Sequence, residues 1–133
     1  MIVVDTNIIS YLFISGKRSQ QAEQLLSLDP HWLSPILWRS EFRSVLNQYL
    51  RKNILTLRDT LFIIQQAEAL LAGNEYQVAS THVMKLLCTS HCSAYDCEFV
   101  ALAKYLKTHL ITADKRILKE FPDIAQSVDY YLA

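Results

Sequence analysis

The segment that most constrains this chain is its start, where three β-branched residues, Ile2-Val3-Val4, run directly into Asp5. A strand without alternation of apolar and polar residues is typical of one buried on both faces, in the middle of a parallel sheet. The residue after such a strand lies at the carboxyl edge of the sheet, where open α/β folds bind their ligands. Asp5 or Thr6 could instead simply cap a helix that begins near Ile8, which is a frequent role for these residue types.

Length and composition narrow the class of protein. A chain of 133 residues can bury its own core, and we expect residues 1–133 to form a single domain. Hydrophobic residues make up 51% and charged residues 20%, which argues against disorder. No apolar run reaches the roughly 20 residues that span a bilayer, and no secretory signal is visible, so we expect a cytoplasmic protein without a membrane partner. Basic and acidic residues number 13 each, so net charge neither favours nor excludes a nucleic acid.

Strand and helix patterns alternate along the chain. The expected strands are 2–4, 31–33, 75–78, 110–112 and 128–132, and the expected helices are 8–14, 17–28, 35–50, 56–71, 80–89, 93–106 and 115–120. Ser34 and Pro35 are expected to be the cap and the first residue of helix 35–50. Because no hairpin turns separate the short strands, the pattern predicts an α/β fold with a short parallel sheet of about five strands between two layers of helices.

Three further acids stand at positions comparable to that of Asp5. Asp114 follows the fourth expected strand, Asp96 lies in the first turn of the sixth expected helix, and Glu41 lies in the second turn of the third. The carboxyl ends of parallel strands and the N-termini of the following helices face one side of the sheet, so these side chains can converge. Each acid alone could be a cap or a surface ion-pair partner, but capping requires no agreement on one edge of the sheet.

A cluster of carboxylates has a specific chemistry. Like charges packed together repel one another unless a cation neutralises them. Ligands that are all oxygen favour Mg²⁺, or Mn²⁺, over zinc. A divalent ion of this kind activates water and stabilises negative charge on a phosphate, so the sequence predicts hydrolysis of a phosphodiester bond.

Four segments of the chain resemble the signature segments of PIN-domain ribonucleases. They are residues 3–7 (VVDTN), 40–46 (SEFRSVL), 95–103 (YDCEFVALA) and 110–114 (LITAD). The short single-domain form is similar to VapC toxins of bacterial toxin–antitoxin pairs. The resemblance implies a three-layer α/β/α fold and a Mg²⁺-dependent endoribonuclease that acts on RNA. It also implies a homodimer held inactive by a small antitoxin whose tail reaches the acidic pocket.

The resemblance assigns roles to particular residues. It implies that the metal-binding and catalytic acids are Asp5, Glu41, Asp96 and Asp114. Thr112 matches the hydroxyl residue two places before the last acid, and Asn7 matches the polar residue that steadies the first. Glu98 is an alternative ligand, but Asp96 fits the family pattern better because of its place before the apolar stripe 99–103.

Other side chains are weaker candidates. Arg43 and Arg116 lie near the acids in sequence and are the first candidates to bind RNA phosphates. Some aromatic residues could stack on bases, and some cysteines and histidines could bind zinc. The aromatic candidates are Tyr11, Phe13, Trp32 and Trp38, of which Trp38 fits the core better while Tyr11 and Phe13 fit an interface with a second copy or an antitoxin. The zinc candidates lack the paired spacing of zinc sites; they are Cys88, Cys92, Cys97, His82 and His91.

Two other functions stay open. Asp5 could be the nucleophile of an aspartyl-phosphate phosphohydrolase, although Asn7 stands where such enzymes have a second acid. The chain could also be an inert PIN-fold or receiver-like interaction domain. Retention of all four acids argues against an inert PIN fold, and the absence of a lysine before Lys115 on the late strand argues against a receiver.

Overall fold

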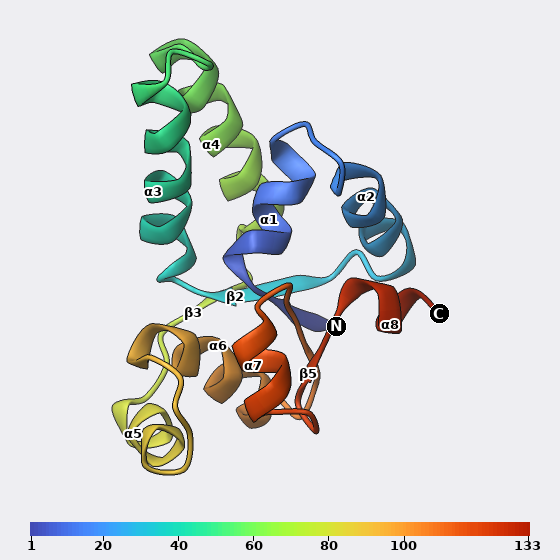
Figure 1. Ribbon diagram of the computed structural model, residues 1–133, viewed down its shortest axis with the longest axis vertical. Helices are drawn as coiled ribbons and strands as arrows, with labels where there is room; N and C mark the ends of the chain where they lie inside the picture. The colour runs from blue at the N-terminus through green and yellow to red at the C-terminus, as the bar shows by residue number, and fades with distance from the viewer.

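The core of the fold is one parallel sheet, seen edge-on across the middle of Figure 1. The computed structural model describes residues 1–133. Five strands follow the order β3-β2-β1-β4-β5, which confirms the expected short parallel sheet. They are β1 (Ile2–Val4), β2 (Trp32–Pro35), β3 (Glu75–Tyr76), β4 (Leu110–Ile111) and β5 (Ala125–Gln126).

β1 is the central strand, as its sequence predicts. Val3 pairs with Leu33 of β2 on one side and with Leu110 of β4 on the other. The side chains of all three β1 residues are at most 1% exposed, because helices cover both faces of the sheet. Asp5 therefore leaves the sheet from the middle of its carboxyl edge.

Two layers of helices enclose the sheet (Figure 1). One layer holds α1 (Thr6–Phe13), α2 (Ser19–Leu28), α3 (Trp38–Arg51) and α4 (Leu57–Leu71), with α8 (Val128–Leu132) packed against α2. The other holds α5 (Ser80–Cys88), α6 (Ala94–Tyr105) and α7 (Lys115–Glu120). The chain thus has the three-layer α/β/α architecture expected from its sequence. No helix is both long and apolar enough to cross a lipid bilayer.

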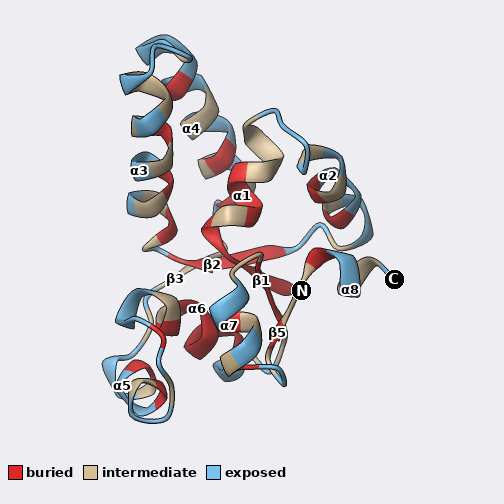
Figure 2. Cartoon of the chain, in the orientation of Figure 1, coloured by how far each residue is buried: buried red, intermediate tan, exposed pale blue.

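α6 has more buried residues than any other helix, and Figure 2 colours much of it as buried. Its apolar stripe packs on β1, β2 and β4. Ser93 caps it by accepting a hydrogen bond from the backbone N–H of Asp96, 3.1 Å away. The cap fixes Asp96 in the first turn of the helix, at the carboxyl edge of the sheet.

The expected role of Ser34 and Pro35 is wrong. They do not begin a helix but form the end of β2, and α3 begins three residues later at Trp38. The Ser34 hydroxyl donates a 2.7 Å hydrogen bond to the carbonyl oxygen of Val4. In a parallel ladder the N–H of residue 35 would reach that carbonyl, but proline has no N–H, so the neighbouring hydroxyl replaces it.

The expected last strand is also misplaced. The strand is Ala125–Gln126, and residues 128–132 form α8 instead. Ser127 causes the change, because its hydroxyl accepts a 3.1 Å hydrogen bond from the Tyr130 N–H and so caps a helix.

Two aromatic candidates belong to the core. Trp32 and Trp38 are both fully buried, so neither can stack on a base. Tyr11 and Phe13 of α1 are partly buried and pack against the core from its margin.

Candidate active site

The four predicted acids come from four segments that end at the same edge of the sheet. Asp5 and Asp114 follow the adjacent strands β1 and β4, and both cap the helix that comes next. Glu41 lies in the first turns of α3, and Asp96 lies in the first turn of α6. In Figure 1, α1 and α3 leave this edge on one side of the sheet while α6 and α7 lie on the other.

Asp5 is the buried centre of the site. Its side chain is 7% exposed and accepts hydrogen bonds at both carboxylate oxygens. Oδ1 accepts from the Thr6 N–H at 2.7 Å, and Oδ2 accepts from Thr112 Oγ1 at 2.7 Å and from Asn7 Nδ2 at 3.3 Å. Burial, aided by the charges of Glu41 and Asp96, nevertheless raises the pKa of Asp5 to about 6, and the hydrogen bonds from Thr112 and Thr6 only partly oppose that shift.

Asn7 and Thr112 tie the ends of β1 and β4 together. Asn7 Oδ1 accepts a 3.2 Å hydrogen bond from the Ala113 N–H, while its amide group reaches Asp5 and Thr112. Thr112 Oγ1 accepts from the Asp114 N–H at 3.0 Å and donates to Asp5. The side chains that the resemblance selected as supporting residues thus contact both strand-end acids or their backbones.

Thr6 is a site residue for which the sequence predicts only a capping role. Its hydroxyl donates a 2.7 Å hydrogen bond to Glu41 Oε1, across 35 residues of sequence. Burial raises the pKa of Glu41, and the negative charges of Asp96 and Glu98 raise it further, whereas the bond from Thr6 opposes the rise. The only sequence feature that points to this role is the position of Thr6 directly after Asp5.

Asp96 links the acids electrostatically. Burial raises its pKa, and the charge of Asp114 adds to the rise. The charge of Asp96 in turn raises the pKa of Asp5 and that of Glu41. Glu98 raises the pKa of Glu41 by its charge, whereas Asp96 raises the pKa of both Glu41 and Asp5.

The two arginines predicted to bind RNA lie at the margin of the site. Arg116 lowers the pKa of Asp96 by its positive charge and donates a 3.5 Å hydrogen bond to the His91 carbonyl. Arg43 lies on the exposed side of α3 and lines an open depression together with Arg39 and Glu98. Both residues are exposed, Arg116 near Asp96 and Arg43 beside Glu98.

The first turn of α3 is fixed by a cluster of charged groups at β3. Glu75 accepts hydrogen bonds from Trp38 Nε1 at 2.7 Å and from Arg39 Nε at 2.6 Å and Nη2 at 2.8 Å. Arg39 also pairs with Glu68 of α4 at 3.3 Å. These bonds anchor the helix turn just before Glu41.

The acidic side chains at the carboxyl edge of the sheet would offer oxygen atoms as metal ligands. No group of three or more His, Cys, Asp or Glu side chains is drawn together tightly enough to hold an ion as the side chains stand.

The cysteines are free thiols; burial raises the pKa of Cys92 to about 11 and raises that of Cys97. His82 stacks against Tyr105, with ring centroids 5.3 Å apart.

Comparison with known protein families identifies the family of this chain. The model of the PIN domain matches residues 2–124. The chain belongs to the PIN-domain family. The resemblance seen in the four sequence segments is therefore confirmed for most of the chain's length.

Relatives of this PIN domain include proteins of known kind. It is 26% identical over 130 residues to Ribonuclease VapC3 of Pyrobaculum aerophilum, covering 91% of this chain and 95% of the relative. Its fold is similar to that of FitAcB from Neisseria gonorrhoeae, with a TM-score of 0.73, 17% identity and coverage of 94% of this chain and 95% of the other. It is also similar to a chain of a toxin–antitoxin complex from Klebsiella pneumoniae, with a TM-score of 0.69, 21% identity and coverage of 96% and 98%.

Proposed function

We propose that this PIN domain is a metal-dependent endoribonuclease that hydrolyses RNA phosphodiester bonds, and that it acts as a VapC-type toxin. One observation carries the proposal. The buried carboxylate of Asp5, held by Thr6 and Thr112, shares the carboxyl edge of the sheet with Glu41 and Asp96, whose charges act on it. Burying a carboxylate beside other carboxylates is costly in a protein that binds no cation there.

The residues fit a hard divalent ion. The donor set consists of carboxylate oxygens, with hydroxyl and amide groups behind them, which suits Mg²⁺ or Mn²⁺. Mg²⁺ retains several waters and uses few protein ligands, so carboxylates that approach without closing around a point are compatible with it. We assign Asp5, Glu41, Asp96 and Asp114 as the residues that would hold the ion. When bound, such an ion activates water and offsets charge on the phosphate.

The protein's own groups have distinct tasks in this proposal. Thr112 and Asn7 orient the Asp5 carboxylate through hydrogen bonds, and Thr6 orients that of Glu41. Arg116 and Arg43 lie where they can attract the phosphates of RNA into a site that is otherwise negative. The site must bind both a cation and a polyanion. In this proposal the acids bind the cation, and the arginines at the edge of the site bind the RNA.

Two relatives support the cellular role. The relative from Pyrobaculum aerophilum is named a ribonuclease VapC, and the Klebsiella pneumoniae neighbour belongs to a toxin–antitoxin complex. We therefore propose that a small antitoxin binds this chain and covers the acids, that the active form is a homodimer, and that the protein works in the cytoplasm where its RNA is.

The geometry favours this function over an aspartyl-phosphate phosphohydrolase. That reaction needs a general acid two residues after the nucleophile. Asn7 occupies the position, and its amide and carbonyl groups are bonded to Asp5 and to the Ala113 N–H. Asn7 thus has a holding role and no proton to transfer.

The decisive experiment compares the wild type with Asp5→Asn. Purified protein is incubated with total RNA with and without Mg²⁺, and new 5′ ends are mapped. We expect cleavage only by the wild type and only with the ion, while circular dichroism shows the same fold for both. Undiminished cleavage by Asp5→Asn would remove the mechanism.

The toxin role has a separate test. Expression of the wild-type chain alone should arrest growth, and co-expression of a neighbouring small open reading frame should relieve the arrest. Unaffected growth would leave a nuclease that is not a toxin.

A further inference from the structure

A depression of about 420 Å³ opens between α1, the loop that follows it, and α3. It begins at Asn7, whose amide group also contacts Asp5. Asn7 therefore connects the depression to Asp5. A ligand that extended from Asp5 past Asn7 would reach this depression.

The residues that line the depression suit a ligand that is both anionic and aromatic. Two tyrosines, Tyr11 and Tyr49, and two cations, Lys17 and Arg18, line it, and no carboxylate does. The guanidinium carbon of Arg18 lies over the ring of Tyr11, 5.5 Å from its centroid. The guanidinium thus stacks on one face of the Tyr11 ring, which brings a positive charge and an aromatic side chain together in the depression.

We propose that this depression binds a nucleotide of the RNA substrate next to the bond that is cut. The base stacks against a tyrosine, and a backbone phosphate contacts Lys17 and Arg18. Proteins hold single-stranded nucleic acid in this way, with basic groups along the backbone and aromatic rings against the bases. The inference rests on the proposed ribonuclease activity and assigns part of its substrate contact.

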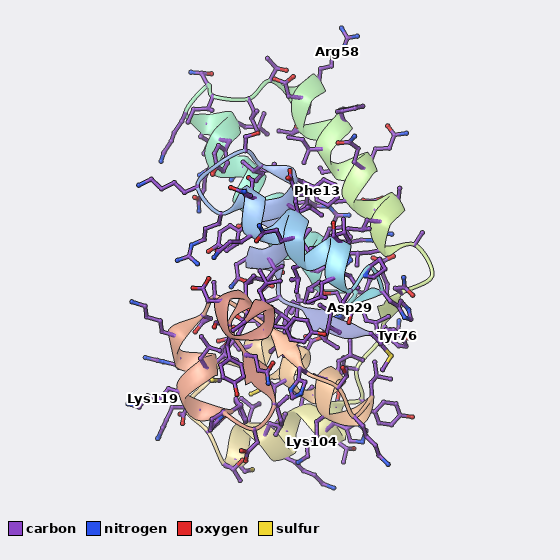
Figure 3. All side chains as sticks on the ribbon, turned by 90° about the vertical axis from the view of Figure 1, so that its right-hand side faces the viewer. Phe13, Asp29, Arg58, Tyr76, Lys104 and Lys119 are labelled. Carbon is purple, nitrogen blue, oxygen red and sulfur yellow. The ribbon has the colours of Figure 1, made fainter.

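A second pocket of similar chemistry lies far from the acids and provides a control. It is a cleft of about 210 Å³ between α5 and α6, lined by His82, Lys85, Lys104 and Tyr105 among others. Figure 3 shows Lys104 in the α5–α7 layer, on the opposite side of the sheet from Phe13 of α1. If any exposed lysine beside a tyrosine bound RNA, substitution here would matter as much as substitution beside Asn7.

The test measures RNA binding without cleavage. In an Asp5→Asn background, a fluorescein-labelled single-stranded RNA of mixed sequence is titrated with protein and followed by anisotropy. We expect Tyr11→Leu to weaken binding roughly tenfold through lost stacking. We expect Arg18→Gln to lower the slope of log Kd against log salt by about 0.7, as for one lost phosphate contact on a single strand. Lys104→Gln should change neither value.

Two conservative variants separate contact from folding. Tyr11→Phe retains an aromatic ring and Arg18→Lys retains a charge, so both should bind RNA nearly as the wild type does. Thermal melting of every variant identifies any that fails to fold. If Tyr11→Leu does not fold, the salt slope of Arg18→Gln decides the proposal, and if Arg18→Gln does not fold, the affinity of Tyr11→Leu decides it. Equal affinities and salt slopes for Arg18→Gln, Tyr11→Leu and the unsubstituted background would overturn the proposal.

Cleavage assays keep the two proposals distinguishable. If the wild-type chain cleaves RNA and Arg18→Gln raises KM with little change in kcat, both proposals stand. If the wild type cleaves and Arg18→Gln does so with the same kcat/KM, the nucleotide site fails and the nuclease stands. If the wild type does not cleave, the nuclease fails and the binding assay alone decides the site. If Tyr11→Leu and Arg18→Gln lose binding to an antitoxin while their RNA binding is unchanged, the depression belongs to the protein partner and the proposal is overturned.

Discussion

Thr6 Oγ1 lies 2.7 Å from Glu41 Oε1, so the residue that follows the buried Asp5 also holds the acid contributed by α3. Thr6 itself is 5% exposed. Asp5 and Thr6, at the end of β1, thus place two carboxylates. Asp5 carries the first on its own side chain, and Thr6 holds that of Glu41 by a hydrogen bond. In metalloenzymes, groups behind the ligands set ligand orientation and so affect both affinity and rate.

Replacing Thr6 by valine should impair the proposed activity without unfolding the protein. Valine has the shape of threonine but no hydroxyl, so the Glu41 carboxylate loses its donor. We expect kcat/KM for RNA cleavage to fall about 10- to 100-fold, as is usual for such supporting residues. Thr6→Ser keeps the hydroxyl and should recover most of the activity. Equal activity of Thr6→Val at limiting Mg²⁺ would show that Glu41 needs no such support.

Asp5 should make the metal-free protein less stable as pH rises. Its pKa is about 6 in the folded chain, above the ordinary 3.8, so the fold holds this proton more tightly than the unfolded chain does. The stabilisation is complete below pH 3.8 and is lost as pH rises through 6. Removing the titration by Asp5→Asn should therefore raise Tm relative to the wild type, increasingly between about pH 4 and 7.

The metal should reverse that order. Thermal melting in EDTA and in Mg²⁺ or Mn²⁺ checks both points, since an ion that binds the native state raises Tm by mass action. Near neutral pH we expect the ion to stabilise the wild type and to have little effect on Asp5→Asn. A Tm difference between the two that is independent of pH and of the ion would contradict the assignment of Asp5 to a cation site.

The bonds from Trp38 and Arg39 to Glu75 should matter for catalysis through Glu41. Glu75 lies in β3, far from the acids in sequence, and its side chain is only 14% exposed. Glu75→Gln removes the charge that holds Arg39 in two hydrogen bonds, so the first turn of α3 loses its anchor. We expect a lower Tm and a severalfold lower kcat.

Glu68→Gln is the matched control for that variant. Glu68 pairs with the same arginine at 3.3 Å, but both side chains are about one-third exposed. Exposed ion pairs contribute roughly 0–1 kcal/mol, so we expect near wild-type Tm and activity. Equal effects of the two variants would mean that the anchor is not specific to β3.

The sequence predicts the parts of the site whose signals are local. An apolar run identifies β1, and the helices expected at 56–71, 93–106 and 115–120 begin after the capping residues Thr56, Ser93 and Asp114. Because the topology of a parallel sheet brings strand ends together, local signals sufficed to place the acids on one edge.

What the sequence does not predict depends on contacts between distant segments. The bond from Thr6 to Glu41 and the bonds of Glu75 join elements more than 30 residues apart. Ser34 and Pro35 have the local pattern of a helix start, but they pair with β3 and so belong to the sheet. Tertiary pairing here overrides a sound local preference.

Ser34 provides a stability test of that override. Its hydroxyl satisfies the carbonyl of the fully buried Val4, which no backbone N–H can reach because residue 35 is proline. Ser34→Ala should leave this carbonyl unpaired and cost about 1–3 kcal/mol of unfolding free energy, measured by urea denaturation. Thr108 makes a hydroxyl-to-carbonyl bond of the same 2.7 Å length to Met1, but at an exposed position. Water can replace that bond, so Thr108→Val should change stability by less than about 0.5 kcal/mol. If both variants lose the same free energy, the Ser34 hydroxyl is an ordinary surface-type bond and β1 does not depend on it.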